Sequence, residues 1–167
     1  NPKLVKHVDY IAVHLLPYHE GVPVEEAAKY AVARYQELML AYPRKRIVIT
    51  EIGWPSSGPT IGASVASEVN QARFVREFLA ENDGNQYDYY LMEAFDQPWK
   101  FNIEGWAGAY WGMFAAKRIQ KYALEGSVSK DDRWAEKAIW ASAIAFLPMV
   151  FIGWRFRSWG MGGVISM

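Results

Sequence analysis

The chain has 167 residues, a formal net charge of zero and no cysteine. Zero net charge without a basic run excludes the usual electrostatic footprint of a nucleic-acid-binding protein, and the lack of cysteine excludes disulfides, thiolate metal ligands and a thiol nucleophile. Because 51% of the residues are hydrophobic and 16% are aromatic, we expect a packed domain rather than a disordered chain.

Three apolar segments of strand length alternate with two segments of helical pattern. We expect strands at 9–16, 46–52 and 87–95, and helices at 23–42 and 66–82. Pro23 suits the first position of a helix, and Ser67 suits an N-cap. The expected apolar stripe of the first helix consists of Ala27, Ala28, Ala31, Leu38 and Met39. This alternation predicts a parallel β-sheet covered by helices, which is an α/β fold.

Polar and aromatic loops follow the three strands: PYHEG, EIGWPSSG and DQPWKFNIEGW. Ligands of parallel α/β folds bind at the carboxyl ends of the strands, so we expect these loops to converge on one pocket. Aromatic faces stack on sugar C–H groups, while carboxylates hold hydroxyls and act at the anomeric carbon. The pattern therefore indicates a carbohydrate site. Its expected wall is Tyr18, Trp54, Trp99 and Trp106, and its expected charged residues are Glu51, Asp96, Lys100 and Glu104.

The segment IVITEIGWPSSG at 47–58 resembles the signature of glycoside hydrolase family 17, the β-1,3-glucanase family. Further segments resemble that family in the same order: VHLLPYHE at 13–20, VNQARFVREFL at 69–79, and EAFDQPWKFNIEG with YWGMF at 93–114. The likeness covers residues 8–116. It implies that this chain is the C-terminal part, about strands six to eight, of a (β/α)₈ TIM barrel.

The resemblance also implies a reaction. Glu51 matches the nucleophile of a retaining glycoside hydrolase or transglycosylase that acts on β-1,3-glucan through a covalent glycosyl-enzyme. In the family, an Asn-Glu pair after strand four carries the acid/base Glu. The sequence contains no such pair, so we expect that Glu upstream of Asn1 and expect the fragment alone to be inactive. No cofactor is implied.

Other positions match family residues around the nucleophile. Tyr18 resembles a cleft tyrosine that hydrogen-bonds the nucleophile, while Lys100 and Glu104 match active-site residues. Gln97 stands where many plant members have Glu. The expected substrate-binding residues are Tyr18, Trp54, Asp96, Gln97, Trp99, Lys100, Glu104 and Trp106.

Each assignment has a structural alternative. Glu51 could cap a loop or pair with a base, and Lys100 could form an ion pair with Glu104. The tryptophans could serve packing only, and Tyr18 could be a wall residue without a chemical role. His14 is expected to be a hydrogen-bonded residue of the barrel rather than a substrate contact, and Glu93 is left unassigned. The histidines show no ligand spacing, so no metal is expected.

The C-terminal part changes character after a polar connector. Residues 138–154 carry no formal charge, and Trp140 and Trp154 lie near the two ends. This pattern predicts a transmembrane helix at the lower limit of length. Lys130 before it and Arg157 after it decide the orientation only weakly. The expected organisation is a barrel part at 1–125, a connector at 126–137, a transmembrane helix at 138–154 and a following segment at 155–167.

The alternative for residues 138–154 is a buried helix that closes the barrel. We favour the membrane because the last barrel helix is already expected near residues 117–124. The expected partners are then β-glucan and a membrane, with the barrel on the periplasmic or extracellular side, where the polymer lies. Two other functions stay open. One is a glycan-binding remnant without chemistry, and the other is an accessory domain of a membrane β-glucan synthase with a downstream glycosyltransferase.

Overall fold

The computed structural model describes residues 2–83, 86–126 and 133–156. They fall into two units, Asn1–Val128 and Ser129–Met167. The first unit opens with a short helix, α1 (Pro2–Val5), and contains a three-stranded sheet in the order β1–β2–β3. These strands are β1 (Tyr10–Leu15), β2 (Arg46–Ile52) and β3 (Asp88–Leu91). Both pairs are parallel, which confirms the α/β prediction.

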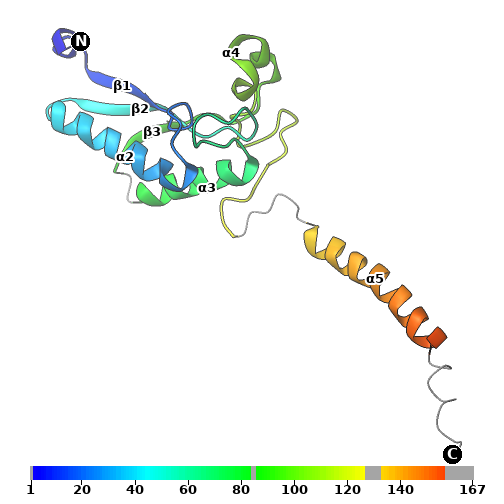
Figure 1. Ribbon diagram of the computed structural model, residues 1–167. Coiled ribbons are helices and arrows are strands. Elements are labelled where there is room, and N and C mark those ends of the chain that lie inside the picture. The colour runs from blue at the N-terminus through cyan, green and yellow to red at the C-terminus, as the bar shows by residue number, and fades with distance from the viewer. Residues whose placement is uncertain (1, 84–85, 127–132, 157–167) are drawn as a thin grey trace, which may run out of the picture. The chain divides into compact units, whose positions relative to one another are not determined.

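Helices α2 (Val24–Ala41) and α3 (Glu68–Glu81) connect the strands and pack against one another (Figure 1). The side chain of Ser67 accepts a hydrogen bond from the backbone N–H of Asn70 at 3.1 Å, so the predicted N-cap is confirmed. Between the helices and the sheet lies a core that includes Ile49, Phe74 and Phe78, each with no exposed surface. Burial of these apolar side chains fixes the face of each helix that meets the sheet.

Met39 was expected in the apolar stripe of α2, but its side chain is 47% exposed. The rest of the predicted stripe is confirmed: Ala27, Ala28 and Ala31 are buried, together with Val24 and Tyr35, and Leu38 packs partly buried against the core. In the last turn of α2 the core contact is made by Leu38, and its neighbour Met39 is left exposed.

The third strand is shorter than the expected 87–95. The N–H of Met92 still donates to the carbonyl of Ile52 at 2.8 Å, but from Glu93 on the chain pairs with a later segment: the N–H groups of Met113 and Phe114 donate to the carbonyls of Glu93 and Ala94, both at 2.9 Å. The loop expected after this strand contains a 3₁₀ turn, η1 (Pro98–Lys100), and a helix, α4 (Phe101–Gly108).

The expected last barrel helix near 117–124 is wrong. These residues form turns and isolated bridges, including an antiparallel bridge between Phe114 and Gln120. The N–H of Ala115 donates to the carbonyl of Ile119 at 2.8 Å, which folds the segment back on itself instead of into a helix. We call residues 113–126 the return segment.

The second unit contains one described helix, α5 (Trp134–Phe156), which includes the segment expected at 138–154. Its part Trp134–Trp154 has a mean hydropathy of 1.5 and is long and apolar enough to cross a membrane. Pro148 lies inside it. Lys130, before the helix, lies outside the described residues. Of the segment expected at 155–167, the first two residues belong to α5, and Arg157 and the residues after it lie outside the described part of the chain.

Candidate active site

Glu51 lies next to the end of β2 and lines a pocket of about 210 Å³. The pocket draws on the ends of all three strands, as predicted from the loops that follow them. It brings Glu51 together with Lys100 and Glu104, two of the residues that sequence reasoning selected. The complete lining is Leu16, His19, Glu51, Met92, Lys100, Glu104, Gly108 and Trp111.

The neighbour of the Glu51 carboxylate is His14 on the adjacent strand. The two residues are register partners across β1 and β2, and Nδ1 of His14 lies 3.2 Å from Oε2 of Glu51. Both side chains are partly exposed, at 58% and 39%. Glu51 is thus a partly exposed carboxylate in contact with one imidazole, rather than a buried loop cap.

Tyr18 does not take the expected position against the nucleophile. Its hydroxyl donates to the carbonyl of Pro59, its ring is fully buried, and burial raises the pKa of the phenol. The ring packs edge-on against Trp54 and Trp111, with centroid distances of 5.5 and 5.9 Å. The expectation is corrected: Tyr18 supports the pocket from beneath, through Trp111.

Trp54 is a core residue, as the alternative interpretation of the tryptophans predicted. Its ring has no exposed surface, packs near Phe74 and donates from Nε1 to the carbonyl of Val65 at 3.0 Å. A ring with both faces buried offers nothing for a sugar to stack on. Trp54 is therefore removed from the pocket wall and assigned to the core below it.

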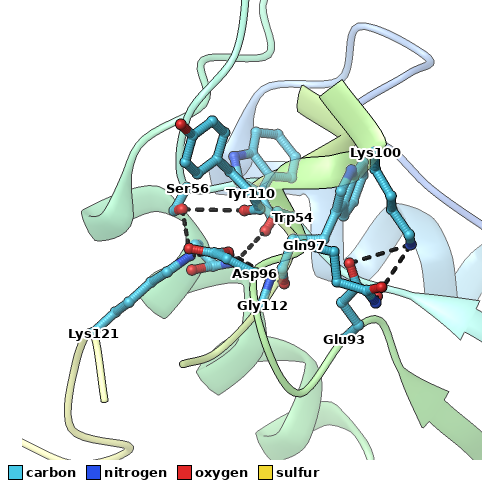
Figure 2. A network of polar contacts seen from close by, with 11 residues as sticks. Trp54, Ser56, Glu93, Asp96, Gln97, Lys100, Tyr110, Gly112 and Lys121 are labelled. Carbon is cyan, nitrogen blue, oxygen red and sulfur yellow. Dashed lines mark hydrogen bonds and ion pairs between the residues drawn. The ribbon is translucent and has the colours of Figure 1, made fainter. Parts of the chain in front are cut away.

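Glu93, left unassigned from the sequence, is the centre of a polar network beside the pocket (Figure 2). Nζ of Lys100 lies 3.1 and 3.3 Å from its two carboxylate oxygens, and Nε2 of Gln97 donates to the same carboxylate. Glu104 is a weaker partner of Lys100, at 4.0 Å. The ammonium of Lys100 is thus held chiefly by Glu93, which leaves most of the Glu104 carboxylate free for other contacts.

Asp96 was expected to bind substrate, and the structure corrects this. It is only 8% exposed, forms an ion pair of 2.6 Å with Lys121 and accepts a hydrogen bond from the N–H of Gly112 at 3.0 Å. Nζ of Lys121 also donates to Oγ of Ser56 at 2.6 Å. Burial lowers the pKa of Lys121, and the hydrogen bond to Asp96 opposes that shift. Sequence reasoning missed Lys121, since nothing local marks its role.

Trp99 and Trp106 lie on η1 and α4 and are 61% and 52% exposed. Neither lines the pocket, and the Lys100 ammonium lies 5.9 Å from the ring centroid of Trp99. Their sugar-stacking role stays a prediction.

Five of the eight lining residues were not selected from the sequence, and two of these, His19 and Trp111, carry rings that could contact a ligand. His19 and Trp111 lie with their rings 5.4 Å apart, and burial lowers the pKa of His19. His19 lies inside the family-like segment 13–20 and Trp111 inside 110–114, and this was the available signal. Among the described residues, no three His, Asp or Glu side chains gather as a metal site would require.

The chain is similar in sequence to known glycoside hydrolases. Residues 1–112 match the model of the BtgE/BtgC glycoside hydrolase domain. The chain is 31% identical over 143 residues to a probable glucan endo-1,3-beta-glucosidase btgC of Aspergillus clavatus, covering 75% of this chain and 20% of that protein. It is 32% identical over 117 residues to the probable family 17 glucosidase SCW4 of Saccharomyces cerevisiae, covering 69% and 30%. The chain thus spans less than a third of these two relatives.

Solved structures give the same picture. An active-site mutant of the Rhizomucor miehei beta-1,3-glucanosyltransferase in complex with laminaritriose matches with a TM-score of 0.66 and 28% identity. The match covers 75% of this chain and 46% of that one. An endo-laminarinase from Formosa matches with a TM-score of 0.53 and 26% identity, covering 68% and 37%.

Proposed function

The chain belongs to the BtgE/BtgC glycoside hydrolase domain family, within glycoside hydrolase family 17, and on that basis we propose that it supplies the nucleophile for retaining cleavage or transfer of β-1,3-glucan. The observation that carries the proposal is the placement of Glu51. Its partly exposed carboxylate lies at a strand end and lines a pocket with Lys100 and Glu104. The names of the similar proteins, glucan 1,3-β-glucosidases and a β-1,3-glucanosyltransferase, support the substrate class.

In the proposed reaction, a carboxylate oxygen of Glu51 attacks the anomeric carbon and forms an ester to the sugar. The glycosidic bond breaks, and its oxygen leaves with a proton from a second carboxylic acid. Water or a sugar hydroxyl then attacks the anomeric carbon and gives its proton to that second group, while the bond from this carbon to the Glu51 oxygen breaks and restores the carboxylate. The sequence contains no Asn-Glu pair, so we propose that the acid/base group comes from a part of the barrel outside this sequence.

The pocket around Glu51 offers the contacts that a glucan needs. Lys100 and His19 are potential donors to sugar hydroxyls, and the Glu104 carboxylate is an acceptor. Trp99 and Trp106 are exposed close by on η1 and α4 and are proposed to stack on further sugar units, as flat rings do on C–H faces. No cofactor enters the reaction, because carboxylates alone stabilise its oxocarbenium-like transition state.

We also propose that α5 anchors the protein in a membrane, with the barrel on the periplasmic or extracellular side. The support is the length and apolar composition of Trp134–Trp154. About 20 apolar residues span the hydrocarbon core of a bilayer. An extracytoplasmic barrel would have access to polymeric glucan.

The experiment is covalent trapping on the full-length protein. A laminari-oligosaccharide with a 2-fluoro substituent and a fluorinated leaving group is incubated with the protein, and mass spectrometry of peptides locates the adduct. We expect the sugar on the peptide that contains Glu51, and none in a Glu51→Gln variant. Glu26→Gln, an exposed change on α2, is the matched control. Oligosaccharide binding without an adduct would replace the catalytic proposal by a glycan-binding role.

A further inference from the structure

Lys121 joins three segments that are distant in the sequence (Figure 2). Its ammonium lies 2.6 Å from Oγ of Ser56, in the loop after β2, and 2.6 Å from Oδ1 of Asp96, in the loop after β3. Lys121 itself belongs to the return segment, 65 and 25 residues away from these two partners. We call Lys121, Ser56 and Asp96 the lysine clamp.

The lysine clamp is built as a fixed element rather than a surface ion pair. The side chains of Lys121 and Asp96 are only 5% and 7% exposed. A buried charge pair is tolerated only where further hydrogen bonds satisfy its polar atoms. Here the same Asp96 oxygen also accepts from the N–H of Gly112 at 3.0 Å, and Oγ of Ser56 donates to the carbonyl of Tyr110 at 3.1 Å.

These bonds surround the residue that closes one side of the pocket. Trp111, which lines the pocket, lies between Tyr110 and Gly112, the two backbone partners of the lysine clamp. The backbone N–H of Ser56 donates to the Tyr110 carbonyl as well, at 2.8 Å. The loop that follows Glu51 is thus hydrogen-bonded to the segment that contains Trp111.

The return segment has a second anchor further along. The guanidinium of Arg76, on α3, donates to the carbonyls of Ala123, Glu125 and Gly126, at 2.9 Å for Glu125 and 2.7 Å for Gly126. The backbone N–H of Lys121 donates to the carbonyl of Met113 at 3.3 Å. The segment that carries Lys121 is therefore hydrogen-bonded both at Lys121 itself and after it, by Arg76. These bonds restrict the position from which the Lys121 side chain reaches the two loops.

We propose that Lys121 is a positioning residue for the Glu51 pocket: through Ser56 and Asp96 it holds the loop that follows the nucleophile against the loop that leads to Lys100. It does not touch the substrate. Ser56 lies five positions after Glu51, and Asp96 lies four positions before Lys100. A change in either loop shifts one wall of the pocket relative to the other. This inference rests on the proposed glucan chemistry at Glu51.

The experiment compares four variants of the full-length protein with the wild type. Lys121→Met removes the charge at nearly constant length, Lys121→Arg restores a cation, and Ser56→Ala removes the hydroxyl that bonds both Lys121 and the Tyr110 carbonyl but keeps the ion pair. Lys117→Met, an exposed change on the same segment, is the matched control. The measurements are kcat and KM on laminari-oligosaccharides, thermal unfolding, and hydrogen exchange of the segments 53–58 and 93–97.

We expect Lys121→Met to lower kcat about tenfold or more, since small displacements of reacting groups are costly in rate, with KM within about twofold. Ser56→Ala should show a smaller loss, and Lys121→Arg should recover part of the rate. Hydrogen exchange should rise in both loops and stay unchanged in α3. Lys117→Met should match the wild type in every measurement.

Two kinds of result would overturn the inference. A folded Lys121→Met variant with wild-type kcat and unchanged loop exchange would show that the clamp does not position the pocket. A loss of activity that only follows the loss of folded protein, with exchange raised throughout the unit, would assign Lys121 to stability. An inactive wild type without an adduct would instead overturn the proposed function, and this inference with it.

Discussion

Glu51 and His14 face each other across adjacent parallel strands, with Oε2 of the carboxylate 3.2 Å from Nδ1 of the imidazole. The pair lies within the sheet rather than in a loop, directly after an irregularity in the register between Val13 and His14. A slip of one strand by one residue would turn that strand's member of the pair to the other face of the sheet and separate the two side chains. The pair therefore gives the carboxylate a defined orientation without burying it.

We expect His14→Ala to lower kcat about tenfold in the full-length protein, equivalent to roughly 1.4 kcal/mol of lost transition-state stabilisation. Stability should change by less than about 1 kcal/mol, because contacts between exposed polar side chains contribute little. Steady-state kinetics and urea unfolding measure the two effects. His7→Ala, an exposed change before β1, is the control. Unchanged kcat in His14→Ala would remove the imidazole from the orientation of Glu51.

Gln71 is a buried connector between α3 and the site. Its Nε2 donates to the carbonyls of Trp54 at 2.8 Å and Trp111 at 3.0 Å, and the residue is 1% exposed. Gln71→Leu would leave both carbonyls without these donors, so we expect a loss of about 1–3 kcal/mol in the free energy of unfolding. Gln36→Leu on the exposed side of α2 should stay within about 0.5 kcal/mol. Equal stability of the two variants in urea would contradict the connector role.

Local sequence patterns predicted much of the sheet and its helices. The strand β2 was predicted to its exact bounds, because an apolar run between Arg46 and the turn at Gly53 leaves little freedom. The end of β3 was not predictable in this way. From Glu93 on, the chain pairs with the segment around Met113, and such long-range pairing has no local signature.

In the candidate site, too, features with a local pattern were predicted and long-range contacts were not. Glu51 and Lys100 were placed correctly in one pocket, because each lies in or beside a strand-end loop. Asp96 was misassigned, since a carboxylate beside a pocket has the same local pattern whether it faces sugar or a buried cation. Its partner Lys121 lies 25 residues away, and only the folded chain brings the two together.

The burial of Tyr122 can be tested through the pH dependence of protein stability. Its side chain is buried, its hydroxyl has no hydrogen-bond partner among the described residues, and burial raises the pKa of the phenol. Above pH 10 the unfolded chain ionises this group while the folded chain keeps it neutral, so stability falls as pH rises. We expect Tyr122→Phe to change stability by less than about 1 kcal/mol at pH 7 and to weaken the alkaline loss.

Urea unfolding at pH 7 and between pH 10 and about 11.5 measures this difference, a window that begins at the ordinary tyrosine pKa. Tyr90→Phe, at a side chain that is 66% exposed, should keep the wild-type pH dependence. A Tyr122→Phe profile that parallels the wild type over the whole range would contradict the burial argument.

Trp99 and Trp106 are exposed beside the pocket without lining it, so stacking and packing predict different results. If a ring stacks on sugar, replacement by Ala should weaken laminari-oligosaccharide binding by about 1–3 kcal/mol, as large aromatic truncations do, with little change in melting temperature. Calorimetric titration of the full-length protein measures the affinity. Leu40→Ala, at a residue that is 82% exposed on α2, is the control. Normal affinity with a lowered melting temperature would assign the tryptophan to packing.

The apolar helix α5 is proposed to cross a membrane, and charge at its centre tests this. Arginine near the middle of a spanning helix costs about 2.5–3.5 kcal/mol for each residue on insertion scales. We therefore expect the double change Ile144→Arg and Leu147→Arg to move the full-length protein from carbonate-washed membranes to the soluble fraction. The volume-conserving pair Ile144→Leu and Leu147→Ile should stay in the membrane. A wild-type protein that carbonate already releases, or an arginine variant that stays fully inserted, would contradict anchoring by α5.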